Sequence, residues 1–253
     1  MILKNIIEVF QQRYSEFLQE DWDNSGIQIA DLNKKIFKVL FVIDITKEAL
    51  EFSIDHNIDL IVSHHPLFFT SLKSLNASEG KSKLILSLIR NNIDVYSMHT
   101  NIDKVRDGVS DELLNMLDYG NKGSLDEEGF LRFTEVNHSF EKIALEIKEK
   151  FHQDRLLYYG KLDHSVNKIA VCGGSGGSFI NLCIEKGIDL YITGDLKHHD
   201  IEAALLNNMN LIDLGHFDSE VHILERMKEE LQSHFPEIQS YILKSNPYER
   251  KYL

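Results

Sequence analysis

Apolar runs of strand length alternate with helical stretches almost throughout this chain. In the first half, the runs at Lys38 to Asp44, Ile58 to Ser63 and Ile93 to Met98 are separated by helical stretches at Thr46 to His56 and Ser78 to Asn92. The three runs are apolar enough to be buried on both faces, as the strands of a parallel sheet are. This alternation predicts an α/β fold with helices packed on its sheets.

Two further helices belong to the first half, and the second half repeats the alternation of strands and helices. An amphipathic helix at Ile2 to Leu18 opens the chain, and a helix at about Ser110 to Leu117 closes the first half. Strands are expected after that helix at residues 130–136, 155–159, 168–172, 188–193, 211–214 and 238–243. Helices are expected at Phe140 to Phe151, between the strands at 168–172, 188–193 and 211–214, and at Val221 to Leu231.

Two domains are expected, with a joint in the polar stretch from Tyr119 to Gly129. The first would span residues 1–122 and the second residues 123–253. The segments IDLIVSHH at 58 and IDLYITGD at 188 each follow a helix and share an Ile-Asp-Leu opening. Either the two halves are related α/β units that face each other, or this common way to begin a buried strand occurs twice by coincidence.

Composition limits the setting of the protein. The 253 residues carry a formal charge of −13, which argues against non-specific binding of nucleic acid but leaves a small phosphorylated substrate open once cations are bound. No apolar stretch approaches the roughly 20 residues that cross a bilayer. Cys172 and Cys183 both lie in apolar patterns and are expected to be buried, reduced thiols, as in a cytoplasmic protein.

Five potential metal ligands lie in three segments, each of which follows a predicted strand. Ligands of open α/β sheets gather at the carboxyl ends of the strands, so these residues could meet there. Three imidazoles and two carboxylates exceed one tetrahedral zinc site and suit two divalent cations. The set consists of His64, His65, Asp103, His216 and Glu220.

The three segments differ in how strongly they indicate a metal. In SHHP, Pro66 ends the strand and neighbouring side chains point to opposite sides, so each histidine could bind one ion; the alternative is that both only cap the strand by hydrogen bonds. Asp103 in MHTNID could bridge two ions or be an ordinary turn residue. His216 and Glu220 are four apart at a helix start and therefore share a face.

Other polar groups have less specific patterns. His99 and His198 each follow a buried strand and are the predicted catalytic residues, with structural roles as the alternative; Asp195 and His199 could contact substrate. The loop GGSGGS at 173–178 could cradle a phosphate or form a plain tight turn. Asp218 and Ser219 are expected to cap a helix.

Several of these motifs together resemble a known family. WDNSGIQI, IVSHHPLFF, MHTNIDKVRDGVSDELL, AVCGGSGGS, ITGDLKHHD and DLGHFDSE occur in the order of the GTP cyclohydrolase 1 type 2 homologs, also called Nif-three-like proteins. The resemblance covers nearly the whole chain. It implies that the same five residues bind two metal ions, that two three-layer α/β domains hold a dinuclear site in the cleft between them, and that the assembly is a toroidal homohexamer, a trimer of dimers.

The expected function is a dinuclear metal-dependent hydrolase that acts on a small molecule, such as a nucleotide. The family resemblance suggests opening of the GTP imidazole ring by metal-bound hydroxide. A metal-dependent phosphoesterase and a non-enzymatic metal-binding or partner-binding regulatory protein are the alternatives. Mixed histidine and carboxylate ligands are compatible with Zn, Fe, Mn or Co.

Overall fold

The computed structural model describes residues 1–120 and 123–248. The chain forms two compact units: the first contains Met1–Ile102 and the segment from Leu224 on, and the second contains Asp103–Ile223. Each unit is a mixed α/β structure built on one sheet. Within the described residues, no helix is both long and apolar enough to traverse a membrane.

The first unit is built on a five-stranded sheet in the order β1-β4-β3-β2-β11. The strands β2, β3, β4 and β11 are parallel, and only β1 runs antiparallel, at the edge next to β4. The parallel arrangement predicted for the three apolar runs is thus confirmed. Their bounds are β1 Gly26–Ile29, β2 Lys38–Val42, β3 Leu60–Ser63, β4 Asp94–Ser97 and β11 Gln239–Ile242.

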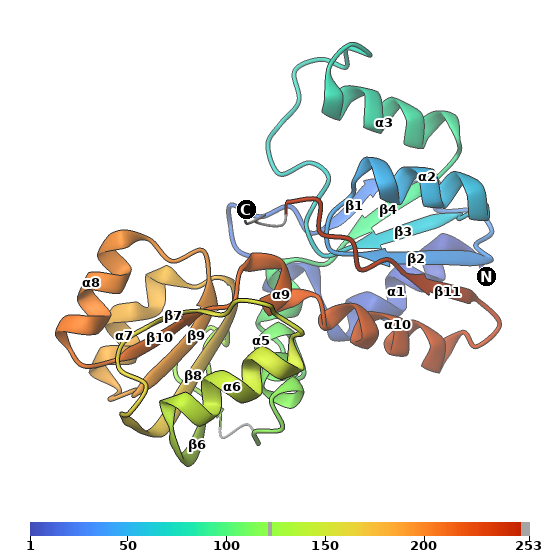
Figure 1. The fold of residues 1–253 in the computed structure, drawn as a ribbon. Coiled ribbons are helices and arrows are strands. Elements are labelled where there is room, and N and C mark those ends of the chain that lie inside the picture. The colour runs from blue at the N-terminus through green and yellow to red at the C-terminus, as the bar shows by residue number, and fades with distance from the viewer. Residues whose placement is uncertain (121–122, 249–253) are drawn as a thin grey trace. The chain divides into compact units, whose positions relative to one another are not determined.

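Helices cover both faces of this sheet (Figure 1). On one face, α2 (Lys47–His56) and α3 (Gly80–Arg90) bury Ala49, Leu50, Ile85 and Leu88 against strand residues such as Ile61. On the other, α1 (Leu3–Arg13) and α10 (Ile223–His234) lie under the strands. Because both faces are dry, the polar ends of the parallel strands are where this unit can present chemistry.

The second unit is built on a six-stranded sheet in the order β5-β6-β8-β9-β10-β7. Here β8, β9 and β10 are parallel, while β6 and β7 pair antiparallel with β8 and β10. The sheet is therefore mixed, with a parallel centre. Its strands are β5 Gly123–Ser124, β6 Arg132–Ser139, β7 Leu157–Tyr159, β8 Ser165–Ser175, β9 Leu190–Gly194 and β10 Asn210–Asp213.

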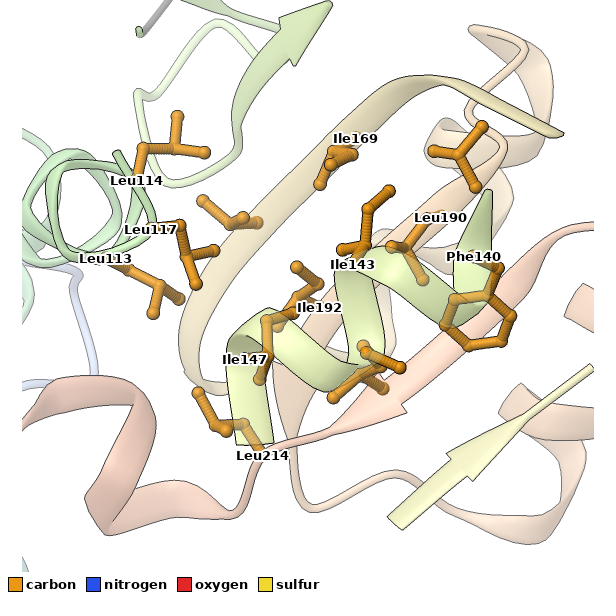
Figure 2. Close-up of a cluster of buried hydrophobic side chains, with 14 residues drawn as sticks. Leu113, Leu114, Leu117, Phe140, Ile143, Ile147, Ile169, Leu190, Ile192 and Leu214 are labelled. Atoms are coloured by element: carbon orange, nitrogen blue, oxygen red, sulfur yellow. The ribbon is translucent and has the colours of Figure 1, made fainter. Parts of the chain in front are cut away.

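Two hydrophobic clusters fill the two faces of this second sheet. Figure 2 shows the first, in which leucines of α5 (Val109–Met116) and Phe140, Ile143 and Ile147 of α6 (Phe140–Lys150) pack against Ile169 and Leu190. The opposite face is covered by α7 (Ile180–Glu185) and α8 (His198–Leu206). Both cysteines lie in that second cluster as buried thiols, as predicted.

The units do not divide where the sequence suggested. Residues 103–120 belong with the second unit, and residues 121–122 of the expected joint, Tyr119 to Gly129, lie outside the described part of the chain. The segment from Leu224 on returns to the first unit because β11 extends its sheet, pairing in parallel with β2. A pairing partner some two hundred residues away cannot be read from a local polar stretch.

The first helix is shorter than expected. The structure ends α1 at Arg13, where the prediction continued to Leu18. The hydroxyl of Ser15 accepts a hydrogen bond from the backbone N–H of Phe17 and so begins a separate 3-10 turn, η1 (Glu16–Leu18). Phe17, which a helix continuing to Leu18 would place on its apolar face, is consequently fully exposed.

The Ile-Asp-Leu opening has the same structural role in both units. The carboxylate of Asp59 accepts hydrogen bonds from the backbone N–H groups of residues 37–38, at 2.8 and 2.9 Å, where β2 begins. Asp189 accepts the equivalent bonds from residues 167–168 near the start of β8, also at 2.8 and 2.9 Å. Each aspartate ties the start of its own strand to that of its parallel neighbour, so the repeated motif marks two units built on one plan.

Candidate functional site

Three histidines of the first unit form a compact donor set. His64 and His65 follow β3, and His99 follows β4, its parallel neighbour in the sheet. Each ring offers one nitrogen, and these three nitrogens lie within 4.8 Å of one another. Sequence position alone had separated His99 from the other two, whereas the structure joins them at the carboxyl ends of adjacent strands.

The Nδ1 atoms of His64 and His65 each form a hydrogen bond with an oxygen atom. His64 is fully buried, and its Nδ1 lies 2.9 Å from the carbonyl oxygen of Met98. His65 Nδ1 lies 2.9 Å from Asp44 Oδ1. Carbonyl and carboxylate oxygens only accept hydrogen bonds, so in the neutral rings Nδ1 carries the proton and Nε2 carries the lone pair. Metal-binding histidines adopt this tautomer when a nearby oxygen atom accepts a hydrogen bond from the ring nitrogen that does not bind the metal.

His99 is held in the same manner by Asp23, at 2.7 Å between Nδ1 and Oδ1. Asp23 also accepts hydrogen bonds from the backbone N–H and the hydroxyl of Thr100. Burial favours the protonated form of Asp23, but the hydrogen bond and charge of His99, together with the Thr100 hydroxyl, outweigh it and hold the pKa of Asp23 well below its ordinary value. Asp23 is therefore an anion that orients the His99 ring.

The second unit contains a separate pair of donors on α9 (His216–Glu220). His216 Nε2 lies 3.4 Å from Glu220 Oε1, as the four-residue spacing predicts. His216 Nδ1 lies 2.7 Å from Asp195 Oδ2, so this ring is oriented by a carboxylate as well. Glu220 is buried. The pair thus offers an imidazole nitrogen and a carboxylate that approach one another closely.

The glycine-rich loop packs directly against this pair. Gly174 has a φ of +63°, and a Cβ there would overlap Glu220 Oε1 and lie 3.4 Å from His216 Nε2. The backbone N–H of Gly174 donates to Ser219 Oγ at 2.9 Å, and that of Gly176 donates to Thr193 Oγ1 at 3.0 Å. Side-chain oxygens already accept from these two N–H groups, so neither is available to a phosphate, and the loop packs closely against Glu220.

The expected capping residues of α9 have other roles. The residue before the helix is Gly215, and no side chain caps the helix start. Ser219 donates its hydroxyl to the carbonyl of His216 at 2.8 Å and accepts from Gly174, while Asp218 accepts from Gln153 Nε2 at 2.8 Å. The capping prediction is wrong because a glycine in an extended, positive-φ conformation begins this helix directly after the strand.

Two other predicted site residues lie in the second unit. Asp103 ends α4 (Thr100–Asp103), and its negative charge contributes, after burial, to raising the pKa of the Cys172 thiol. His198 is exposed at the start of α8, where its ring lies 5.6 Å from that of His199. Asp195, expected to contact substrate, instead binds His216.

The chemistry of both donor sets fits divalent cations. Imidazole nitrogen and carboxylate oxygen are ligands for Zn, Fe, Mn and Co. In each unit a carboxylate or carbonyl fixes the Nδ1 side of the ring, and next to Glu220 the chain carries a glycine where any larger side chain would fill the space. The residues present thus fit a metal ion, and the types of ligand alone do not determine which metal binds.

Sequence reasoning missed the residues that orient the donors. Asp44 and Asp23 carry no metal-ligand spacing, because they contact their histidines through the tertiary fold. A signal did exist for each: Asp44 follows an apolar strand directly, and Asp23 lies in the WDNSG motif. A carboxylate at a strand end beside a histidine-bearing strand is a pattern that could have identified Asp44.

The chain is similar to known proteins along nearly its whole length. Residues 1–248 match the family described as Duf34/NIF3 (NGG1p interacting factor 3). The chain is 34% identical over 248 residues to a GTP cyclohydrolase 1 type 2 homolog of Clostridium perfringens, which covers 92% of this chain and 94% of that protein. Among solved structures it is similar to a hypothetical protein of Staphylococcus aureus (TM-score 0.92, 25% identity, 99% of both chains) and to reduced HcgD of Methanocaldococcus jannaschii (TM-score 0.85, 30% identity, 96% and 98% of the two chains).

Proposed function

The chain belongs to the Duf34/NIF3 family, and on that premise we propose that it is a metal-dependent hydrolase acting on a small molecule. The five residues proposed to hold two divalent cations are His64, His65, Asp103, His216 and Glu220. The observation that carries the proposal is the oriented imidazole: Nδ1 of His64, His65 and His216 is bound to an oxygen, so Nε2 is the atom presented to a cation.

Bound divalent cations would supply Lewis acidity and lower the pKa of water to near neutrality. The chain's own contribution to catalysis is proton transfer, for which we propose His99 and His198. His99 is the better supported, because the Asp23 carboxylate orients its ring beside His64 and His65. His198 is supported by its place after β9, where its exposed ring could meet a substrate.

GTP is the substrate suggested by the names of the curated relatives. In the reaction we propose to test, one water adds at C8 of the imidazole ring and the bond from C8 to N9 breaks, leaving a formamide. A second water then splits the formamide into formate and an amine. No oxidant or reductant is consumed, so the reaction needs only acid–base groups and Lewis acids.

The test is product analysis by mass spectrometry after incubation of freshly metallated protein with a pool of nucleotides and phosphoesters. A hydrolase gives products whose mass increases by that of water or decreases by loss of a fragment such as formate. His99→Ala and His198→Ala should keep near-normal metal content, while turnover falls by about 10²-fold or more. Full turnover by both variants would contradict the assigned roles, and an unchanged pool would contradict the hydrolase.

Assembly as a homohexamer, a trimer of dimers, is a further part of the proposal and rests on the family resemblance. Native mass spectrometry of the purified chain tests it directly. A hexamer mass is expected at micromolar concentration, and a stable monomer would contradict it.

A further inference from the structure

Two exposed aromatic side chains lie beside the histidine set of the first unit. Trp22 is 59% exposed and Phe69 is 53% exposed. Their ring centroids are 5.9 Å apart, and each lies close to the His99 ring, at 6.0 and 6.3 Å. Large aromatic rings that remain half in water next to a chemically competent site are typical of a ligand-binding surface.

The pair is held in place by hydrogen bonds. Gln28 Oε1 accepts from the backbone N–H of Phe68 at 3.0 Å, and Asn24 Nδ2 donates to the carbonyl of Phe68 at 2.8 Å. Gln28 Nε2 in turn donates to the carbonyl of Asn24 at 2.8 Å. These three bonds tie the loop that carries Phe69 to the segment that carries Trp22, so the two rings form a built surface.

The angle between the rings indicates what fits there. The planes of Trp22 and Phe69 are inclined by 57°, and Trp22 meets His99 nearly edge-on, at 75°. A flat ring stacked on one of the two aromatic faces would therefore present its edge toward the other, and both arrangements are favourable for aromatic pairs. An aromatic ligand can use both arrangements at once, whereas a non-aromatic ligand has no ring edge and face to pair in this way.

We infer that Trp22 and Phe69 form a stacking platform for the planar nitrogen heterocycle of the substrate, next to His99. The inference rests on the proposed function, because it takes the bound molecule to be the substrate of that reaction. It deepens the proposed function by naming the class of molecule and the residues that select it. Stacked on the platform, the ring lies beside the His99 imidazole, which is where the proposed proton transfer takes place.

The test exploits the fact that Trp22 is the single tryptophan of the chain. Its fluorescence therefore reports contact at this position alone. Guanosine is titrated into the full-length zinc-loaded protein and into the chelator-treated protein, with D-ribose as the non-aromatic probe and N-acetyltryptophanamide to correct for absorption by the nucleoside. We expect saturable quenching by guanosine and none by D-ribose.

Phe69→Leu keeps an apolar side chain but removes the ring, and it should weaken guanosine binding by roughly fivefold or more. Phe37→Leu is the matched control, since Phe37 is 62% exposed and precedes β2, at the amino ends of the parallel strands, whereas His64 and His65 lie at the carboxyl ends. Its affinity should equal that of the unmodified protein.

Three results would overturn the inference: no saturable quenching, equal affinities of the two variants, or Trp22 emission that shifts with protein concentration alone, which would mean that a second copy covers the surface. Binding does not require turnover, so the outcomes are separable. Quenching in protein that takes up no metal during zinc loading would leave the platform standing and contradict the metal proposal, whereas full metal loading without quenching would do the reverse.

Discussion

His65 and Asp44 are joined by a 2.9 Å hydrogen bond between Nδ1 and Oδ1, and they come from the ends of two neighbouring parallel strands. His216 and Asp195 are joined in the same way at 2.7 Å, again from the ends of neighbouring parallel strands, β10 and β9. In both units the fold thus supplies a carboxylate that fixes the ring of a predicted ligand. This pairing fixes the orientation of the ring and so lowers the entropy lost when an ion binds.

Removing these carboxylates should weaken metal binding without touching a ligand. We expect Asp44→Asn and Asp195→Asn each to lower metal affinity by about 10- to 100-fold, the usual effect of losing the partner of a ligating histidine. Competition titration with a chromophoric chelator measures the affinity. Asp55→Asn and Asp163→Asn remove the same charge at exposed positions and should bind as the unmodified protein does. Equal affinities in all four variants would refute an orienting role.

A substitution in the glycine loop should disturb Glu220 from outside. Gly174→Ala and Gly187→Ala both force alanine into a left-handed conformation, with φ of +63° and +66°, at a similar cost of about 1–2 kcal/mol. Only at Gly174 would the new methyl group overlap Glu220, whereas nothing lies within 4 Å at Gly187. Both variants should therefore lose stability in thermal unfolding, but only Gly174→Ala should also lose bound metal. Loss of metal in both would point to general destabilisation.

The aspartates of the two Ile-Asp-Leu motifs should each contribute to the free energy of unfolding. Asp59→Ala and Asp189→Ala each leave two backbone N–H groups at or near the start of a strand without their carboxylate. Each should lower the free energy of unfolding by about 1–3 kcal/mol, and by similar amounts, because the same two bonds are lost. Denaturant unfolding measures this. A loss in one unit and none in the other would show that the two motifs are alike only in sequence.

The Asp126 turn should contribute to acid sensitivity. Burial disfavours its charged form, but hydrogen bonds from Ser124 and from the N–H groups of Leu131 and Phe130 outweigh burial and lower the pKa of Asp126. Since the folded pKa is below the unfolded value of about 4, the stabilisation is present above that pH and is lost as the pH falls through the folded pKa. Asp126→Asn should be less stable at neutral pH and show a shallower loss of stability in acid. Parallel stability–pH curves for the two proteins would contradict this.

The sequence predicted the local parts of this structure well because each part has a local cause. The β2, β3 and β4 strands were found from apolar runs, and the His216–Glu220 pair from helical spacing. What failed depends on distant pairing. Strand β1 is four residues long and is recognisable only by its antiparallel partner β4, and β11 joins the first unit only because it pairs with β2.

The ligand set was likewise easier to predict than its surroundings. Histidines that follow buried strands are conspicuous in a sequence, whereas Asp23 and Asp44 become significant only when the sheet brings their strand ends beside those histidines. Trp22 was part of a recognised motif, but its exposure and its contact with His99 follow from the way the loop after β3 is tied back to β1. The glycine loop was ambiguous because close packing and phosphate binding demand the same residue.

The central claim is that oriented imidazoles and carboxylates hold divalent cations, and the metal content of the purified chain tests it most directly. Elemental analysis of protein loaded with Zn, Fe, Mn or Co in turn and then desalted should find up to two ions per chain. The double variant His64→Ala, Glu220→Ala should lose most of both, while Asp55→Asn keeps them. A content that never rises above zero in metal-supplemented, folded protein would contradict the account.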